Sequence, residues 1–127
     1  MSTALLLIAH GSSQPEANAD LHHLAETLSQ GGYGIVVASF LELAEPGIGA
    51  GGARCVELGA ARVVMVPYFL SAGVHVRRDL TEARAQLAAR FPHVEFRLAE
   101  PLGRHPLLTE VVIERVLDAA KPQAPGD

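Results

Sequence analysis

Hydrophobic and polar positions alternate along the chain in blocks that predict four strands, each followed by a helix. The apolar runs at 4–9 and 63–66 are typical of strands buried on both faces. Two further strands are expected at 34–40 and 93–98, the last of them alternating and therefore at an edge of the sheet. Four strand–helix units predict a single α/β domain with a parallel sheet between two layers of helices, in the strand order 2-1-3-4.

Polar residues and prolines mark where the helices should begin. Ser13 and Glu16 form a capping-box pattern, and Asp79 with Glu82 forms a second one. Pro106 suits the first turn of the last helix, which is expected to bury an apolar stripe. The members of that stripe are Leu108, Val112, Val116 and Ala119.

The segment 48–58 is the least regular of the expected helices. It contains Gly49, Gly51 and Gly52, and each glycine inside a helix costs about 1 kcal/mol relative to alanine. We therefore expect a short, late-starting or mobile helix here.

Composition narrows the classes of protein that the chain can belong to. Its 127 residues are 49% hydrophobic, which predicts one domain over 1–120 with a disordered tail over 121–127. We find no apolar run long enough for a membrane span and no signal-peptide pattern, so we expect a cytoplasmic protein. A net charge of −4 disfavours nucleic acid and anionic membranes as partners. One cysteine, Cys55, excludes an intramolecular disulfide and is expected to be buried and inert.

Two of the six histidines, His10 and His75, follow buried strands and stand beside glycines. In open α/β sheets, ligands bind beyond the carboxyl ends of the strands, and the expected order makes these two strands neighbours. Neutral imidazole binds Fe, Co, Ni, Cu and Zn. Glu42, at the end of the second strand, is a candidate third ligand or a base, and such a set leaves coordination positions open.

Other polar residues admit plainer interpretations. His22 and His23 lie in mid-helix and His93 opens a strand, so we expect all three to be solvated, whereas His105 suits a helix cap. The segment 11–13 also suits an anion-binding loop, although it lacks the spacing of a dinucleotide or Walker motif. Arg77 and Arg78 fit either a solvated pair or a site for substrate carboxylates.

Three segments together resemble the short-form CbiX/SirB family, the sirohydrochlorin chelatases. They are LLLIAHGSSQPEAN, FLELAEP and VVMVPYFLSAGVHVRRDL, and the resemblance covers nearly the whole chain in order. It implies a class II chelatase fold of flavodoxin-like topology. It also implies ATP-independent insertion of Co²⁺, Fe²⁺ or Ni²⁺ into sirohydrochlorin, towards cobalamin or sirohaem, by a homodimer without a permanently bound cofactor.

The resemblance also suggests roles for individual residues. His10 and His75 would be the metal ligands, with His10 also accepting a proton; Glu42 is the other candidate base. The loop after the third expected strand and the neighbourhood of Glu45 would contact the macrocycle. The loop residues are Leu70, Ser71, Ala72, Gly73 and Val74, and Arg77 and Arg78 would pair with substrate carboxylates.

The segment after Pro46 departs from the family pattern, and two other functions are compatible with part of the sequence. After Ala44-Glu45-Pro46 the family usually has serine or threonine and then a well-formed helix, whereas here Gly47 and more glycines follow. A metal-delivery module without chelatase chemistry would use the same two histidines. A histidine phosphatase is disfavoured, because its motif needs an arginine before the histidine and Ala9 stands there.

Overall fold

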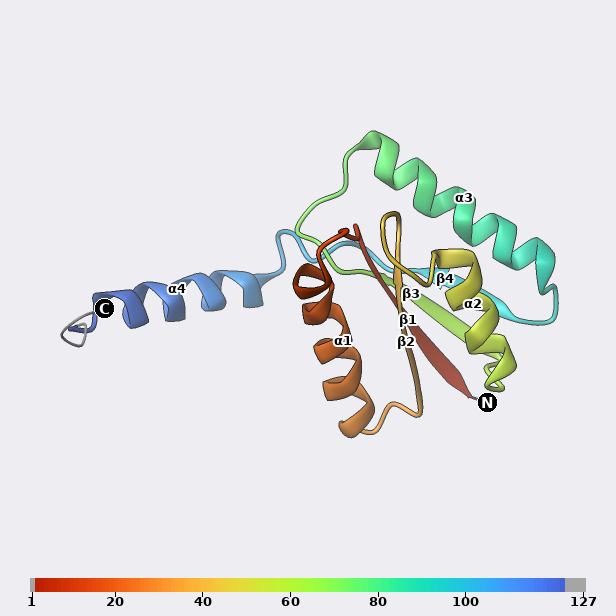
Figure 1. Ribbon diagram of the computed structural model, residues 1–127, viewed down its shortest axis with the longest axis horizontal. Helices are drawn as coiled ribbons and strands as arrows, with labels where there is room; N and C mark the ends of the chain where they lie inside the picture. Colours follow the sequence, from red (N-terminus) through yellow and green to blue (C-terminus); the bar gives the residue numbers. More distant parts are fainter. Residues whose placement is uncertain (1, 123–127) are drawn as a thin grey trace.

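The computed structural model describes residues 2–122 and consists of one four-stranded parallel sheet with helices on both faces (Figure 1). The strand order is β2-β1-β3-β4, as predicted, with β2 and β4 at the edges. The strands are β1 (Thr3–Ala9), β2 (Ile35–Phe40), β3 (Arg62–Pro67) and β4 (Glu95–Leu98). The helices are α1 (Pro15–Gln30), α2 (Ile48–Glu57), α3 (Val74–Arg90) and α4 (Pro106–Ala120).

Two apolar clusters separate the layers of the domain. One packs α2 and α3 on the sheet, and its buried members include Leu6 and Met65 from the strands with Leu87 from α3. The other packs α1 against the opposite face, where Leu21 meets Leu7. Side chains of a buried strand alternate between faces, which explains why consecutive residues of β1 serve different clusters.

The glycine-rich segment forms a helix, α2, that begins at Ile48, so the expectation of a late start is wrong, although with 10 residues α2 is the shortest of the helices described here. Gly51 and Gly52 are buried against the sheet and α3. A Cβ on Gly51 would lie 2.9 Å from Leu6 Cδ1, and one on Gly52 would lie 2.6 Å from Leu87 Cδ2. The glycines are therefore the contact surface of α2, and the intimate packing offsets their low helix propensity.

Two helix starts differ from the sequence prediction. Helix α1 is preceded by Gln14 without a side-chain cap, and the Ser12 hydroxyl accepts a hydrogen bond from the Gln14 backbone N–H instead. Helix α3 begins at Val74 rather than at Asp79, with Gly73 as N-cap and the Arg77 N–H donating to the Gly73 carbonyl at 2.9 Å. His75 therefore lies in the first turn of α3 and not in the preceding loop.

Helix α4 leaves the body of the domain as a separate arm (Figure 1). None of its residues is buried, and neither apolar cluster includes any of them. The predicted burial of Leu108, Val112, Val116 and Ala119 is therefore wrong within this chain.

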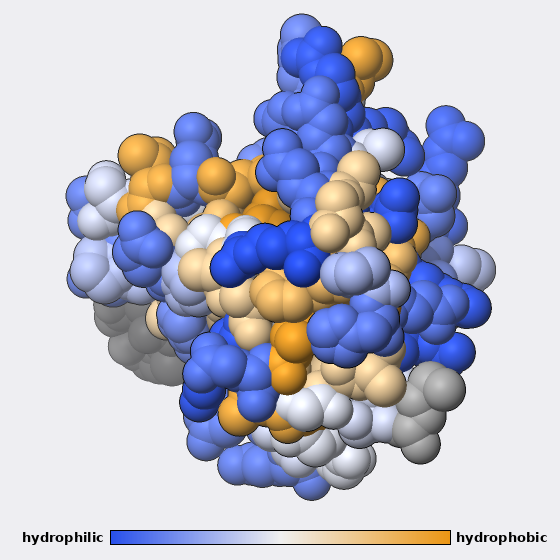
Figure 2. Space-filling model, turned by 90° about the vertical axis from the view of Figure 1, so that its right-hand side faces the viewer, coloured by the Kyte–Doolittle hydropathy of each residue, from blue (hydrophilic) through white to orange (hydrophobic). Residues whose placement is uncertain are grey.

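The surface at the end of the molecule opposite α4 is mixed: apolar atoms form a strip across its middle, bordered by hydrophilic side chains (Figure 2). No helix within residues 2–122 is long and apolar enough to cross a membrane. Most of the predicted tail, residues 123–127, lies outside the described residues.

Candidate functional site

His10 stands at the carboxyl end of β1, where the chain passes close to the segment after β2. The Leu41 N–H donates to the Ala9 carbonyl at 2.9 Å, and the Glu42 N–H donates to the His10 carbonyl at 3.1 Å. Gly11 has a φ of +93°, and a Cβ there would lie within 1.8 Å of the Glu42 carbonyl oxygen. Only glycine permits this approach, which brings His10 and Glu42 to one rim.

The His10 ring also packs on Phe69, with the two ring centroids 4.6 Å apart and an interplanar angle of 30°. Phe69 follows β3, so the contact joins the ends of two adjacent strands. His10 is nevertheless exposed. An accessible imidazole held against an aromatic ring can receive a ligand from solvent without a large rearrangement.

His75 is exposed in the first turn of α3, where Arg78 approaches it from one turn further on. Arg78 Nη2 lies 2.9 Å from His75 Nδ1. Because a guanidinium only donates, Nδ1 is the acceptor and the neutral ring carries its proton on Nε2. A metal binds a ring nitrogen that lacks a proton, so Nδ1 is available to a ligand only when the contact with Arg78 is broken.

A cavity of about 390 Å³ opens beside His10. His10, Leu41 and Glu42 line one side of it, and α3 supplies most of the other side. The α3 residues are Val76, Asp79, Glu82, Ala83 and Gln86. The cavity thus combines one imidazole with three carboxylates, which attract cations and accept protons.

Sequence analysis missed Asp79, Glu82 and Gln86 as site residues, because it assigned the first two to a helix cap. A signal was present: positions 75, 79, 82 and 86 recur at intervals of three and four, which places them on one face of a helix. That periodicity becomes visible only when the helix is known to begin before His75.

Within residues 2–122, no three His, Cys, Asp or Glu side chains come together as a group that could hold a metal ion.

The remaining predicted site residues lie around the same rim. Arg77 pairs with Glu100 at 3.4 Å, and its Nε donates to the Ala72 carbonyl at 3.3 Å. Leu70 and Ser71 line a second hollow together with Arg77 and Arg104. Glu45, Gly73 and Val74 are exposed, while Ala72 is half-buried. The loop after β3 is therefore accessible to a large ligand, and Arg77 is anchored to its neighbours.

The plainer interpretations of the other residues agree with the structure. His105 Nδ1 accepts from the Leu107 N–H at 3.2 Å, which confirms the cap. His22, His23 and His93 are exposed, but His93 lies in the turn before β4, which begins at Glu95, so the prediction that it opens the strand is wrong. Cys55 is fully buried, and burial raises the pKa of its thiol to about 11, so the thiol is inert at neutral pH.

The CbiX family model matches residues 4–119, which include almost all of β1, the other three strands and almost all of α4. This chain belongs to the CbiX family. Among its curated relatives, the sirohydrochlorin cobaltochelatase of Priestia megaterium is 40% identical, over 89% of this chain and 37% of that protein. The sirohydrochlorin cobaltochelatase of Sulfolobus acidocaldarius is 32% identical, and 87% of each chain is covered.

CbiX-family structures share the fold. The CbiX protein of Marinobacter aquaeolei VT8 superposes with a TM-score of 0.81 at 32% identity, over 92% of this chain and 96% of that chain. Bacillus subtilis SirB with Fe³⁺ gives a TM-score of 0.85 at 30% identity, over 96% of this chain but only 49% of its own length. The first three curated relatives are likewise covered over half their length or less, by 37%, 50% and 47%.

Proposed function

We propose that this CbiX-family chain is a sirohydrochlorin chelatase that inserts Co²⁺ or Fe²⁺, with Ni²⁺ as a further candidate, into sirohydrochlorin. The observation that carries the proposal is the position of His10, accessible at the mouth of an acidic cavity at the carboxyl ends of the strands. The family supports it, because relatives named as cobaltochelatases and ferrochelatases match nearly the whole chain.

In the proposed mechanism, His10 and His75 hold the entering metal ion. Insertion replaces two N–H protons of the macrocycle by one divalent ion, so both protons must be accepted by nearby groups. His10 and Glu42 are the proposed acceptors, and the cavity also places Asp79 and Glu82 close by. The metal is a substrate here, and no permanently bound cofactor or ATP is required.

The substrate is proposed to lie over the rim formed by residues 70–74 and Glu45. Sirohydrochlorin carries many carboxylates, which are proposed to pair with Arg78, beside His75, and with Arg104, which lines the hollow next to Leu70 and Ser71. Arg77 is proposed to exchange its partner Glu100 for a substrate carboxylate. The side chains of Arg77 and Glu100 are 56% and 84% exposed, so solvent screens their ion pair.

We further propose a cytoplasmic homodimer whose subunits are chelatase domains spanning residues 1–120. A ring-shaped substrate needs a second wall, and the cavity of one chain is open to solvent. SirB is about twice as long as the segment that this chain matches, since the match covers 49% of it. Two copies of this chain therefore supply the equivalent of one such protein.

The test is an absorption assay with sirohydrochlorin and Co²⁺, in which insertion changes the spectrum of the macrocycle. The wild type should accelerate the change, whereas His10→Ala and His75→Ala should each fall to the uncatalysed rate. His23→Ala is the matched control, because His23 is also exposed but lies in α1 away from the rim. If the wild type binds Co²⁺ but never accelerates insertion, the protein is a metal-delivery module instead.

A further inference from the structure

A contact between His75 and Arg78 joins a proposed metal ligand to a proposed substrate-binding residue. The two side chains belong to the start of α3 and are three positions apart, a spacing that places them on the same side of the helix. Arg78 Nη2 lies 2.9 Å from His75 Nδ1, and both residues are exposed. The contact is therefore within reach of a ligand that approaches from solvent.

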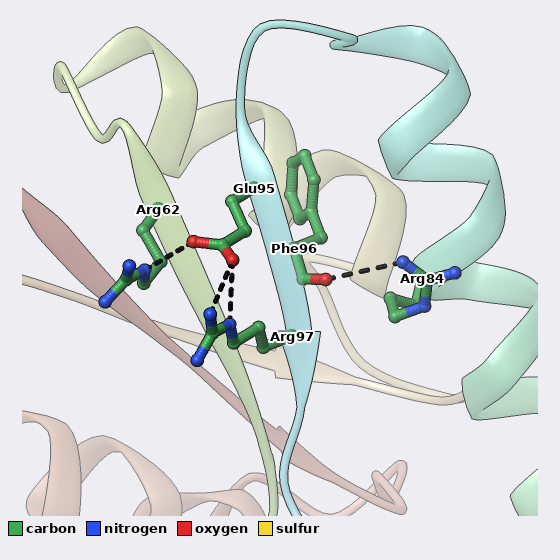
Figure 3. A network of polar contacts seen from close by, with 5 residues as sticks. All are labelled: Arg62, Arg84, Glu95, Phe96 and Arg97. Carbon is green, nitrogen blue, oxygen red and sulfur yellow. Dashed lines mark hydrogen bonds and ion pairs between the residues drawn. The ribbon is translucent and has the colours of Figure 1, made fainter.

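Arg78 has an imidazole as its partner, where several other arginines of the domain have carboxylates. Arg62 and Arg97, for example, both donate to Glu95, as Figure 3 shows. Within residues 2–122, Arg78 forms no ion pair with an aspartate or a glutamate. Its positive charge is thus held by a neutral acceptor, and an anion that arrives at the rim would be a stronger partner.

The contact closes His75 to a metal ion, whichever ring nitrogen the metal would use. A neutral imidazole has one nitrogen with a proton and one without, and a metal binds the nitrogen without a proton. While Arg78 donates to Nδ1, the proton is on Nε2 and the acceptor nitrogen is occupied. Binding of a metal at Nε2 would place the proton on Nδ1, where it would face the N–H of Arg78. His75 therefore becomes a ligand only after Arg78 has moved.

A substrate carboxylate is able to move Arg78. A carboxylate accepts two parallel N–H bonds from a guanidinium and carries the opposite charge, whereas Nδ1 of a neutral imidazole accepts one bond and carries no charge. A bidentate pair with a carboxylate is therefore the more favourable contact for the guanidinium. When Arg78 turns to the carboxylate, the unprotonated nitrogen of His75 is released.

We propose that Arg78 is a positioning residue, which withholds His75 from metal ions until a substrate carboxylate takes the guanidinium. The proposal rests on the proposed function, in which His75 is a metal ligand and Arg78 meets the macrocycle. Because the macrocycle and the metal both require this contact to break, each should bind more tightly when the other is present. The gain is limited by the free energy of the contact, which corresponds to a change in affinity of about threefold to tenfold.

The first test titrates Co²⁺ alone into the protein in a calorimeter, without a macrocycle. Arg78→Met removes the donor to His75 together with one positive charge. Arg77→Met is the matched control, because it removes the same charge from the neighbouring exposed residue and leaves the contact with His75 in place. We expect Arg78→Met to bind Co²⁺ about three to ten times more tightly than Arg77→Met. Equal affinities would show that only the charge matters and would overturn the proposal.

A double-mutant cycle shows whether Arg78 acts through His75. In a protein that already carries His75→Ala, Arg78→Met and Arg77→Met should have the same effect on the affinity for Co²⁺. If Arg78→Met still increases the affinity more than the control does, Arg78 acts on another group and the proposal is wrong.

The second test follows the His75 ring by ¹⁵N NMR, with metal-free sirohydrochlorin as the probe. In the free wild type the proton should be on Nε2, and Nδ1 should have the chemical shift of a hydrogen-bonded acceptor. Sirohydrochlorin should move the ring signals towards those of free Arg78→Met, in which the donor is absent. Ring signals that keep their original positions while sirohydrochlorin binds would show that the contact survives, which would overturn the proposal.

Metal insertion is assayed in parallel so that the two proposals fail separately. A protein that shows the effects on Co²⁺ affinity and on the His75 ring but never inserts Co²⁺ supports the role of Arg78 and contradicts the chelatase. A protein that inserts Co²⁺ while Arg78→Met and Arg77→Met bind the metal equally supports the chelatase and contradicts the role of Arg78. If sirohydrochlorin does not bind at all, both proposals are wrong.

Discussion

At the scale of single residues, the rim is organised by close contacts around His10. Gly11 admits the carbonyl of Glu42, and Phe69 supports the imidazole ring from the end of β3. A histidine placed by backbone and ring contacts keeps its nitrogens available. This arrangement explains how an exposed side chain is held in position at the mouth of the cavity.

Cys55 gives a pH-dependent prediction at the same scale. Burial raises the pKa of its thiol from 9.0 to about 11, partly opposed by a hydrogen bond with its own backbone. The thiolate forms more readily in the unfolded chain than in the folded one. The free energy of unfolding should therefore be independent of this group below about pH 9 and should decrease between about pH 9 and pH 11. Denaturant titrations should show this decline, and Cys55→Ala should lose that part of it.

A thiol reagent provides the independent check on Cys55. At neutral pH the native protein should react slowly and the denatured protein at once. Rapid labelling of the native state would show that the thiol is accessible and that the decline has another origin.

At the scale of elements, the packing of α2 depends on its glycines. Gly52→Ala should lower the free energy of unfolding by about 1–2 kcal/mol, because overpacking against Leu87 outweighs the gain in helix propensity. Gly49→Ala in the same helix is the matched control, since a Cβ there meets nothing within 4 Å. It should be stabilising by about 0.5–1 kcal/mol. Equal effects of the two changes would refute the close-packing explanation.

The attachment of β4 to β3 gives a second prediction for an element. Hydrogen bonds from Arg62 and then Arg97 hold the pKa of Glu95 below its ordinary value of 4.5. The contribution of Glu95 to stability should therefore be present above about pH 4.5 and be lost as the pH falls through the lowered value.

The measurement is the difference in melting temperature between wild type and Glu95→Gln across this acidic range. The difference should shrink on acidification, and also in high salt at neutral pH, because the group is exposed. A difference that stays constant with pH would mean that the ion pairs contribute nothing.

At the scale of the whole molecule, helix α4 is rich in apolar residues and none of them is buried. If two chains complete each other, the melting temperature should rise with protein concentration, because folding and association are then linked. Calorimetry over a hundredfold concentration range tests this, with light scattering on the same samples. A constant melting temperature from a monomeric sample would contradict the dimer.

Much of this architecture could be predicted from the sequence. The four strands, their order and the edge position of β4 follow from apolar runs and from the rules of parallel sheets, which act locally or through topology. The position of His10 at the end of β1 follows in the same way. The start of α3 could not be predicted, because Val74 and Val76 are weak helix formers and Gly73 is a weak signal.

The candidate site was accordingly predicted only in part. Its residues from β1 and β2, His10 and Glu42, come directly after apolar runs. Its residues from α3 are Asp79, Glu82 and Gln86, and their common face depends on a helix that begins at Val74 rather than at Asp79. One error in the start of the helix changed the role assigned to Asp79 and Glu82.

The sequence by itself determined the strand–helix alternation, the sheet order and the delivery of histidines to the carboxyl rim, because hydrophobic periodicity specifies which faces must be buried. It did not determine what buries them. Two outcomes depend on distances between segments far apart in the chain. One is whether the glycines of α2 weaken the helix or allow close packing, and the other is whether α4 packs on its own sheet. Only the tertiary structure decides those, since the same apolar stripe can be buried by its own chain or by another.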